Sequence, residues 1–237
     1  MALPQLNEVP KYNITIPSTG KKVRFRPYLV KEEKILLMAV ESGDNTMALE
    51  AVVDTIEACI VDKIDTSRLT TFDVEYLFTQ IRAKSSGESV NIGLKCKAED
   101  CNHMSEVAIK LDDIKLRVPR KDTVQELSEE VSIELRFPPY TVLTNLDMSE
   151  DRTNTDKTFE LAGMCIEAVI HNDERISCDE ITTEEMTDFI EQMTTEQFKK
   201  LTDFVESMPR LTHKVAWACE ACRHENEITV EGMQSFF

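Results

Sequence analysis

Two short cysteine pairs are the residues of this chain best placed to do chemistry. The first is Cys96-x4-Cys101 and the second is Cys219-x2-Cys222. Zinc prefers four ligands arranged as a tetrahedron, and structural zinc sites commonly use four thiolates, which two such turns together supply. Because four thiolates leave no open coordination position, we predict one structural rather than catalytic zinc, bound by Cys96, Cys101, Cys219 and Cys222.

Two other interpretations of the cysteine turns remain open at this point. His103 and His224 each lie two residues after the second cysteine of a pair, so either imidazole could replace a thiolate or be only a surface residue. The pairs could also be ordinary reduced thiols. The chain has 7 cysteines, an odd number, and Cys59 and Cys165 fall within helical patterns as small buried hydrophobes. This usage favours a reducing cytoplasm.

The elements that must position the cysteines occur twice in the sequence. Residues 23–30 and 135–142 both alternate apolar and polar residues and then meet proline, as a strand does when it gives way to a helix. This alignment places Phe25 opposite Phe137. Symmetric halves that fold against each other would bring their cysteine turns together, which strengthens the zinc prediction.

Helical signals recur in the same order after these strands. Residues 49–60 and 159–170 each carry apolar residues at the i, i+3, i+4, i+7 spacing of one helix face. An acidic residue stands three positions after Thr70 and three positions after Thr182, which is typical of a capped helix start. Chance similarity between amphipathic helices is the alternative, but strand, capped helix and cysteine pair recur in one order.

We therefore predict an α+β fold that is internally duplicated. Residues 10–118 form the first half and residues 128–237 the second, and together they could make one compact domain. Each half should contain a small antiparallel sheet and helices, and a zinc-ribbon-like cysteine site should join them. An additional helix in the second half precedes its cysteine pair and ends at Pro209.

The remaining elements follow from periodicity and turn residues. We predict a helix over residues 31–41 that turns Ile35, Met38 and Ala39 inward and ends near Gly43. The other predicted elements are a hairpin over 12–16 and 21–26, helices over 47–61 and 71–83, a loop over 145–156, and strands over 89–95, 106–111, 213–218 and 227–230.

Composition argues against several classes of protein. Of 237 residues, 44 are acidic and 27 basic, which gives a net charge of −17. Nucleic-acid backbones and anionic membranes repel such a surface, so we expect no nucleic-acid partner. The chain lacks an apolar run of about eighteen residues and a secretory signal, so we expect no membrane insertion. The acidity favours a basic partner, although a solvated helix face is the simpler explanation for residues 179–191.

Catalytic motifs are scarce in the sequence. The chain has only 6 glycines, and it contains no glycine-rich phosphate loop, no G-x-S-x-G and no H-E-x-x-H motif. No carboxylate pair stands out among the many acids. We therefore expect a protein that is not an enzyme.

The N-terminal third resembles a known family. Residues 10–21, Pro-Lys-Tyr through Ile-Pro-Ser-Thr-Gly-Lys, and residues 25–34, Phe-Arg-Pro-Tyr-Leu-Val-Lys-Glu-Glu-Lys, are similar to the T4-type bacteriophage baseplate hub family, the subunits of the central spike complex of contractile tails. The similarity extends over the whole chain. The family has no assigned catalytic motif, so the resemblance implies a structural or assembly role in the baseplate.

The resemblance also implies partners and a location. Other baseplate hub proteins would be the partners, in the host cytoplasm during assembly and then in the tail baseplate of the virion. As contact residues we predict Arg26, Tyr28, Tyr140, Phe236 and Phe237, because tyrosine and arginine are favoured interface anchors. Packing is the simpler role for Arg26, Tyr28 and Tyr140.

Two functions of other classes remain as alternatives. The cysteine pairs are compatible with a zinc-ribbon regulatory protein associated with nucleic acid, although the chain lacks a basic face. Some hub components are cell-wall hydrolases, which would need a cleft with a perturbed acid or an open metal position.

Overall fold

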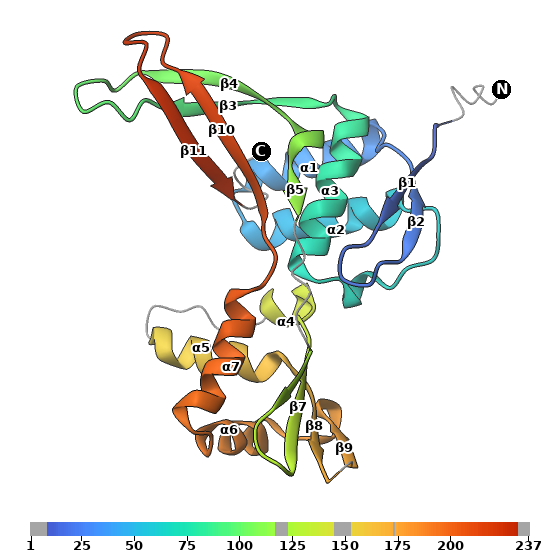
Figure 1. Ribbon diagram of the computed structural model, residues 1–237. Helices are drawn as coiled ribbons and strands as arrows, with labels where there is room; N and C mark the ends of the chain where they lie inside the picture. The colour runs from blue at the N-terminus through green and yellow to red at the C-terminus, as the bar shows by residue number, and fades with distance from the viewer. Residues whose placement is uncertain (1–8, 117–122, 145–152, 173, 232–237) are drawn as a thin grey trace, which may run out of the picture. The chain divides into compact units, whose positions relative to one another are not determined.

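The computed structural model describes residues 9–116, 123–144, 153–172 and 174–231 (Figure 1). The chain divides into two compact units: unit 1 comprises Met1–Arg117 and Arg210–Phe237, and unit 2 comprises Val118–Pro209. Both units combine helices with small antiparallel sheets. The predicted α+β class is confirmed.

Unit 1 begins with a hairpin that leads into three helices. Its N-terminal elements are β1 (Tyr12–Thr15), β2 (Lys22–Phe25), α1 (Val30–Ser42), α2 (Asn45–Cys59), the short 3-10 helix η1 (Thr66–Arg68) and α3 (Thr71–Ser85). The predicted cap of α3 is present, because the Thr70 side chain accepts the Asp73 N–H and Asp73 accepts the Thr70 N–H. Helix α1 ends where predicted, at Gly43, whose φ of 69° favours glycine.

Two long hairpins complete unit 1. Their elements are β3 (Ser89–Lys95), β4 (Met104–Lys110), the 3-10 helix η2 (Leu111–Asp113), β5 (Lys115–Leu116), β10 (Leu211–Ala218) and β11 (Glu225–Glu231). Strand β3 pairs with β4, and β10 pairs with both β11 and β5. Residues from both hairpins share one apolar cluster with Ala83 of α3, including Ile109, Val215 and Val230. Burial of this cluster holds the two ends of unit 1 together.

Unit 2 packs helices against a four-stranded sheet of order β6-β7-β8-β9. Its elements are β6 (Val124–Glu126), β7 (Val131–Leu135), α4 (Tyr140–Thr144), α5 (Asn154–Met164), β8 (Ile166–His171), β9 (Glu174–Ser177), the 3-10 helix η3 (Cys178–Glu180), α6 (Thr183–Glu191) and α7 (Thr195–Glu206). Leu201 and Phe204 of α7 close its core, in which Phe137 stacks on Phe204 with ring centroids 4.6 Å apart.

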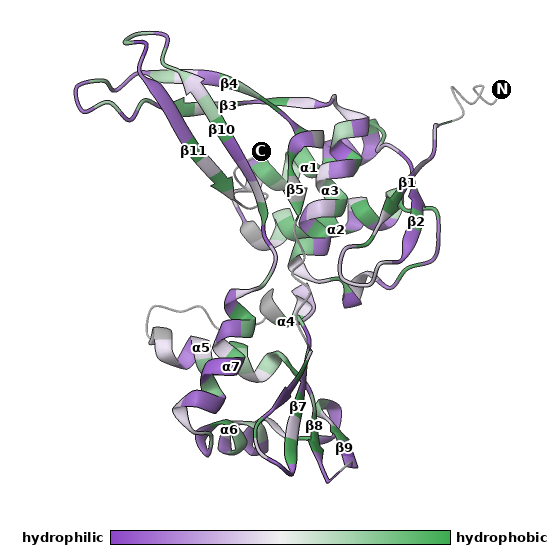
Figure 2. Cartoon of the chain, viewed as in Figure 1, coloured by the Kyte–Doolittle hydropathy of each residue, from purple (hydrophilic) through white to green (hydrophobic). Residues whose placement is uncertain are grey.

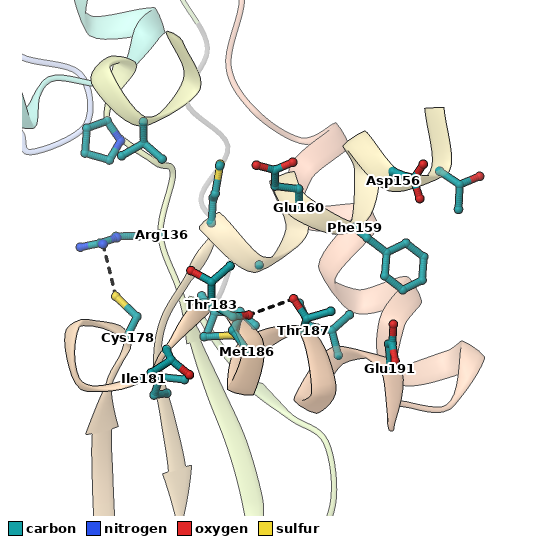
Figure 3. A pocket seen from close by; sticks show the side chains of 18 residues that line it. Arg136, Asp156, Phe159, Glu160, Cys178, Ile181, Thr183, Met186, Thr187 and Glu191 are labelled. Atoms are coloured by element: carbon teal, nitrogen blue, oxygen red, sulfur yellow. Dashed lines mark hydrogen bonds between the residues drawn. The ribbon is translucent and has the colours of Figure 1, made fainter. Parts of the chain in front are cut away.

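A pocket of about 800 Å³ lies in unit 2 between α5 and α6 (Figure 3). Apolar side chains including Phe159 and Met186 line it, and at one end the Arg136 guanidinium lies 3.4 Å from the Cys178 sulfur. Burial raises the pKa of the Cys178 thiol. A raised pKa favours the protonated thiol, which is the less nucleophilic form.

The two units do not coincide with the two predicted halves. Residues 210–237 belong to unit 1 rather than to the unit that contains 128–209. The physical reason is strand pairing: β10 is hydrogen-bonded to β5 through Leu211 opposite Leu116, and its hairpin shares the apolar cluster of β3 and β4. The additional predicted helix is α7, and it stays in unit 2.

The predicted helix over 159–170 is wrong in its second half. Helix α5 spans Asn154–Met164, so it also begins inside the predicted loop over 145–156, and Ile166–His171 is strand β8. Apolar residues at 166, 169 and 170 fit either a helix face or a buried strand. Pairing with both β7 and β9 decides for the strand.

The prediction that Phe25 and Phe137 are equivalent is also wrong. Phe25 is a buried strand residue that bridges to Ile60 directly after α2. The residue that makes the corresponding contact in unit 2 is Leu135, which pairs with Ile166 after α5. Phe137 lies two residues beyond it.

Helix α1 exposes most of its large apolar side chains. Ala39 is buried as predicted, but Ile35 and Met38 are exposed, which contradicts the predicted inward face. The large exposed apolar residues of this helix are Val30, Ile35, Leu37, Met38 and Val40. Figure 2 colours the helices and strands by the hydropathy of their residues. Among the described residues, no helix is both long and apolar enough to cross a bilayer.

Candidate metal centre

The tips of the two long hairpins of unit 1 carry the four cysteines. Cys96 directly follows β3 and Cys101 precedes β4, while Cys219 directly follows β10 and Cys222 precedes β11. The strand registers hold each tip, because Lys95 faces Met104 in one hairpin and Ala218 faces Glu225 in the other. Each hairpin therefore presents two thiols at one end.

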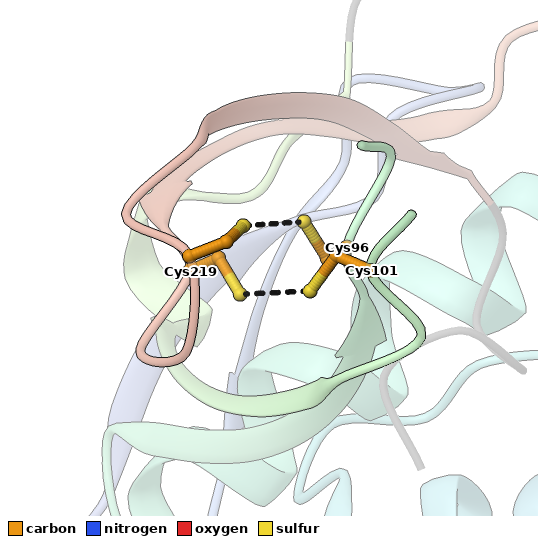
Figure 4. A group of neighbouring side chains, drawn as sticks. Cys96, Cys101 and Cys219 are labelled. Carbon is orange, nitrogen blue, oxygen red and sulfur yellow. Dashed lines mark hydrogen bonds between the residues drawn. The ribbon is translucent and has the colours of Figure 1, made fainter. Parts of the chain in front are cut away.

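The four sulfur atoms form one cluster. All lie within 4.8 Å of one another. The closest approaches join the two hairpins, with 3.6 Å between the Cys96 and Cys222 sulfurs and 3.8 Å between those of Cys101 and Cys219 (Figure 4). Disulfide sulfurs would be about 2.05 Å apart, whereas a zinc tetrahedron with bonds of about 2.3 Å has edges of roughly 3.8 Å. The donor set and its spacing fit a tetrahedral metal ion.

The cysteine cluster is partly shielded from water. Cys96 and Cys219 are buried, and Cys222 is exposed. A hydrogen bond from the Cys222 N–H is the largest of several contacts that lower the pKa of Cys219, whereas burial and the neighbouring sulfurs raise the pKa of Cys222. A thiolate is the form that binds metal, so Cys219 takes the ligand form more readily than Cys222 does.

The two histidines play matching backbone roles. The Cys96 N–H donates to the His103 carbonyl and the Cys219 N–H donates to the His224 carbonyl, both at 2.9 Å. The His103 imidazole lies 3.9 Å from a carboxylate oxygen of Glu220. The metal-binding cluster found among the described residues consists of thiols alone, so the structure does not bring an imidazole into the set.

Sequence reasoning missed Asn226. Its buried side chain lies between the hairpins: the amide nitrogen donates to the His224 carbonyl at 2.8 Å and contacts the Cys96 sulfur at 3.7 Å, while the amide oxygen accepts the Lys97 N–H at 2.8 Å. No metal motif includes this position. The only signal was that a polar residue occurs four positions after the second cysteine of each pair.

The predicted contact residues that the structure describes all take part in the local structure. The Arg26 guanidinium pairs with Glu32 at 2.8 Å. The Tyr28 N–H donates to Ser85 Oγ at 2.9 Å, and its hydroxyl forms a hydrogen bond with Ser86. Tyr140 begins α4 and is half-buried.

Phe236 and Phe237, the other two predicted contact residues, lie outside the described residues.

Comparison with known proteins gives one finding. The family model described as T4 bacteriophage base plate protein matches residues 9–237. No curated protein sequence and no solved structure matches the chain.

Proposed function

The chain belongs to the T4 bacteriophage base plate protein family, and on that premise we propose that it is a structural and assembly subunit of the baseplate hub that binds other baseplate proteins. The observation that carries this proposal is the family match over residues 9–237. Its location would be the host cytoplasm during assembly and then the tail of the virion.

The metal centre supports a structural role. We propose one zinc ion, held by Cys96, Cys101, Cys219 and Cys222, which the distances and the donor set fit. Bound zinc would crosslink the two hairpins, and four thiolates would leave it no position for a substrate. Because unfolded chains seldom preform such a site, metal binding would contribute directly to folding.

Internal duplication is also part of the proposal. In each unit an arginine directly follows a strand and donates its backbone N–H to the carbonyl of a cysteine at the C-terminal end of a helix: Arg26 to Cys59 at 2.9 Å, and Arg136 to Cys165 at 2.8 Å. In each, a threonine-capped helix follows, α3 or α6. Two cysteine hairpins with matching backbone contacts complete the pattern.

The exposed face of α1 supports a protein partner. Exposed groups of large apolar residues typically mark interaction sites, and Val30 is 79% exposed and Val40 69% exposed on this helix. A second copy of the chain would bring another net charge of −17, which opposes self-association. We therefore assign this face, together with the predicted contacts Arg26, Tyr28, Tyr140, Phe236 and Phe237, to other baseplate proteins.

Co-purification tests the proposed function. The tagged full-length chain is co-expressed with the hub proteins of its phage and purified through its tag. The proteins that remain bound are identified by mass spectrometry. The expected result is stable capture of at least one hub protein. Recovery of nucleic acid instead would support the zinc-ribbon regulator, and cleavage of peptidoglycan would support a hydrolase. Either result without capture of a hub protein would contradict the proposal.

Two sets of variants locate the contact surface. Leu37→Glu with Met38→Glu should weaken capture without unfolding the chain, because both side chains are exposed, whereas Met104→Glu on β4 is an equally exposed control. Deleting Phe236 and Phe237 should weaken capture and leave the fold intact, since a terminus is seldom needed for a core. Unchanged capture by either variant would remove that surface from the interface.

A further inference from the structure

Two buried polar side chains stand at matching positions beside the cysteine turns. Ser105 is the fourth residue after Cys101, and Asn226 is the fourth residue after Cys222. They lie in β4 and β11, and both strands repeat the same order of exposed, buried, exposed, half-buried, exposed and buried residues from the start of the strand. Ser105 is 2% exposed and Asn226 is 4% exposed. Both side chains therefore face the interior of their hairpin.

Asn226 shows what this position does in the second hairpin. Its amide nitrogen contacts the sulfur of Cys96, a cysteine of the first hairpin, at 3.7 Å. The other bonds of the amide, to the Lys97 N–H and the His224 carbonyl, fix its orientation. A side chain from one hairpin thus donates to a thiol of the other.

Ser105 holds the matching position in the first hairpin, but its side chain differs from that of Asn226 in its hydrogen bonding. Its hydroxyl oxygen is buried and lacks a hydrogen-bond partner among the described residues. A buried polar group without a partner destabilises the fold, because it has lost its hydrogen bonds to water. The hydroxyl is therefore available to donate a hydrogen bond beyond those that the described residues make.

A metal-bound thiolate can accept such a hydrogen bond. Four thiolates around a divalent ion carry a net charge of −2, and the chain itself carries −17, so donors to sulfur would stabilise the loaded site. Residues that hydrogen-bond to metal ligands in this way commonly change metal affinity by about 10–100-fold.

We propose that Ser105 and Asn226 are a reciprocal pair of positioning residues for the metal centre. Asn226 of the second hairpin donates to Cys96, and Ser105 of the first hairpin donates to Cys219, the counterpart of Cys96, when metal is bound. This inference rests on the proposed metal centre, and it assigns that centre two donors beyond the four ligands.

Metal competition on the full-length chain tests the pair. Zinc affinity is measured against a chelator of known affinity for wild type, Ser105→Ala and Asn226→Ala. Each variant should bind zinc about 10-fold or more weakly, and Ser105→Thr, which restores the hydroxyl, should recover affinity. Thr229→Ala, on the exposed face of β11, is the matched control and should bind as wild type does.

A second measurement separates a positioning role from packing. In the zinc-free chain, Ser105→Ala should leave the unfolding temperature unchanged or raise it, because the hydroxyl has no acceptor there. In the zinc-loaded chain the same variant should lower it. Equal zinc affinity for wild type and Ser105→Ala would overturn the inference while leaving the metal centre intact. A wild-type chain that binds no zinc would overturn both.

Discussion

Arg26 of unit 1 and Arg136 of unit 2 each lie where a strand meets the end of a helix, and we call these two places the Arg26 corner and the Arg136 corner. The two corners make the same backbone contacts, but their ion pairs differ. Both arginines donate a backbone N–H to the carbonyl of a helix-ending cysteine, Cys59 or Cys165. In both corners the preceding strand residue pairs with the residue after that cysteine. The shared part is therefore the crossing of a strand with a helix end.

The ion pairs of the two corners differ in burial. The Glu32 side chain is 5% exposed; it pairs with Arg26 and also accepts the Leu29 N–H at the start of α1. Glu167 is 30% exposed, pairs with Arg136 at 2.6 Å, and has Arg175 at 4.0 Å as a second cation. The buried ion pair of unit 1 therefore helps to hold the start of α1, whereas the ion pair of unit 2 is partly exposed to water.

The ends of the two units differ as well. Unit 2 closes its core with α7, and the hairpin that follows joins unit 1. Unit 1 therefore holds both cysteine hairpins. The comparison indicates that a similar crossing of a strand with a helix end occurs in both units, while the parts around it differ.

Removal of a metal ligand should give the largest effect. Cys219→Ser takes one thiolate from the cluster, so zinc binding and the stability that it contributes should fall together, by several kcal/mol or more, since zinc in finger peptides binds with about 10–16 kcal/mol. Thermal unfolding with and without added zinc measures this. Cys178→Ser in unit 2 is the control. Equal zinc-dependent stabilisation in both variants would refute a role for Cys219.

Loss of the arginine should be more costly in unit 1 than in unit 2. Arg26→Met leaves the buried Glu32 carboxylate with the exposed Lys31, at 3.3 Å, as its remaining cation among the described residues, and should lower the free energy of unfolding by about 3 kcal/mol. Arg136→Met should cost about 1 kcal/mol, because Glu167 is partly solvated and keeps Arg175. Denaturant titration compares the two, and equal losses would show that burial does not distinguish the corners.

The capping acids offer a smaller contrast. Asp73 is fully buried and accepts the N–H groups of Thr70 and Ser18, whereas Glu185 caps the exposed start of α6. Asp73→Asn should therefore cost about 2 kcal/mol, and Glu185→Gln should cost clearly less. If chemical denaturation ranks these variants in the reverse order, the proposed difference between the two caps does not hold.

The pH dependence of Glu32 should give the smallest effect. Burial raises the pKa of its carboxyl, but hydrogen bonds from Arg26 and the Leu29 N–H outweigh burial and lower it below 4.5. The ionised carboxylate then favours the folded chain above about pH 4.5, and this contribution is lost as the pH falls through the folded pKa. Wild type should lose stability more steeply than Glu32→Gln as the pH falls below about 4.5; equal slopes would contradict this assignment.

Local signals in the sequence were sufficient for much of unit 1. Strand β3 spans the predicted residues, and α2 and α3 agree with prediction within two residues at each end, because caps, periodicity and turn residues act over a few positions. Three features depended on distant parts of the chain. Pairing made 166–171 a strand, and β10 joined unit 1. Ile35 and Met38 are exposed because none of the described elements covers them.

Prediction of the candidate metal site from the sequence was also limited by contacts between distant parts of the chain. The cysteine spacing identified the four thiols, and the four sulfurs do lie together as predicted. The turns meet inside unit 1, which holds both hairpins, and not between two halves of the chain. Ser105 and Asn226 could not be identified as site residues, because their role depends on which way a strand side chain faces and on what lies opposite it.

Zinc content is the most direct test of the proposed metal centre. The full-length chain is purified without chelator, and its zinc is measured by elemental analysis alongside the number of thiols that react under native conditions. We expect about one zinc per chain, as one tetrahedral site requires. The thiols of Cys96, Cys101, Cys219 and Cys222 should be protected until a chelator is added. A folded chain that contains no metal and has these thiols reactive would contradict the proposed metal centre.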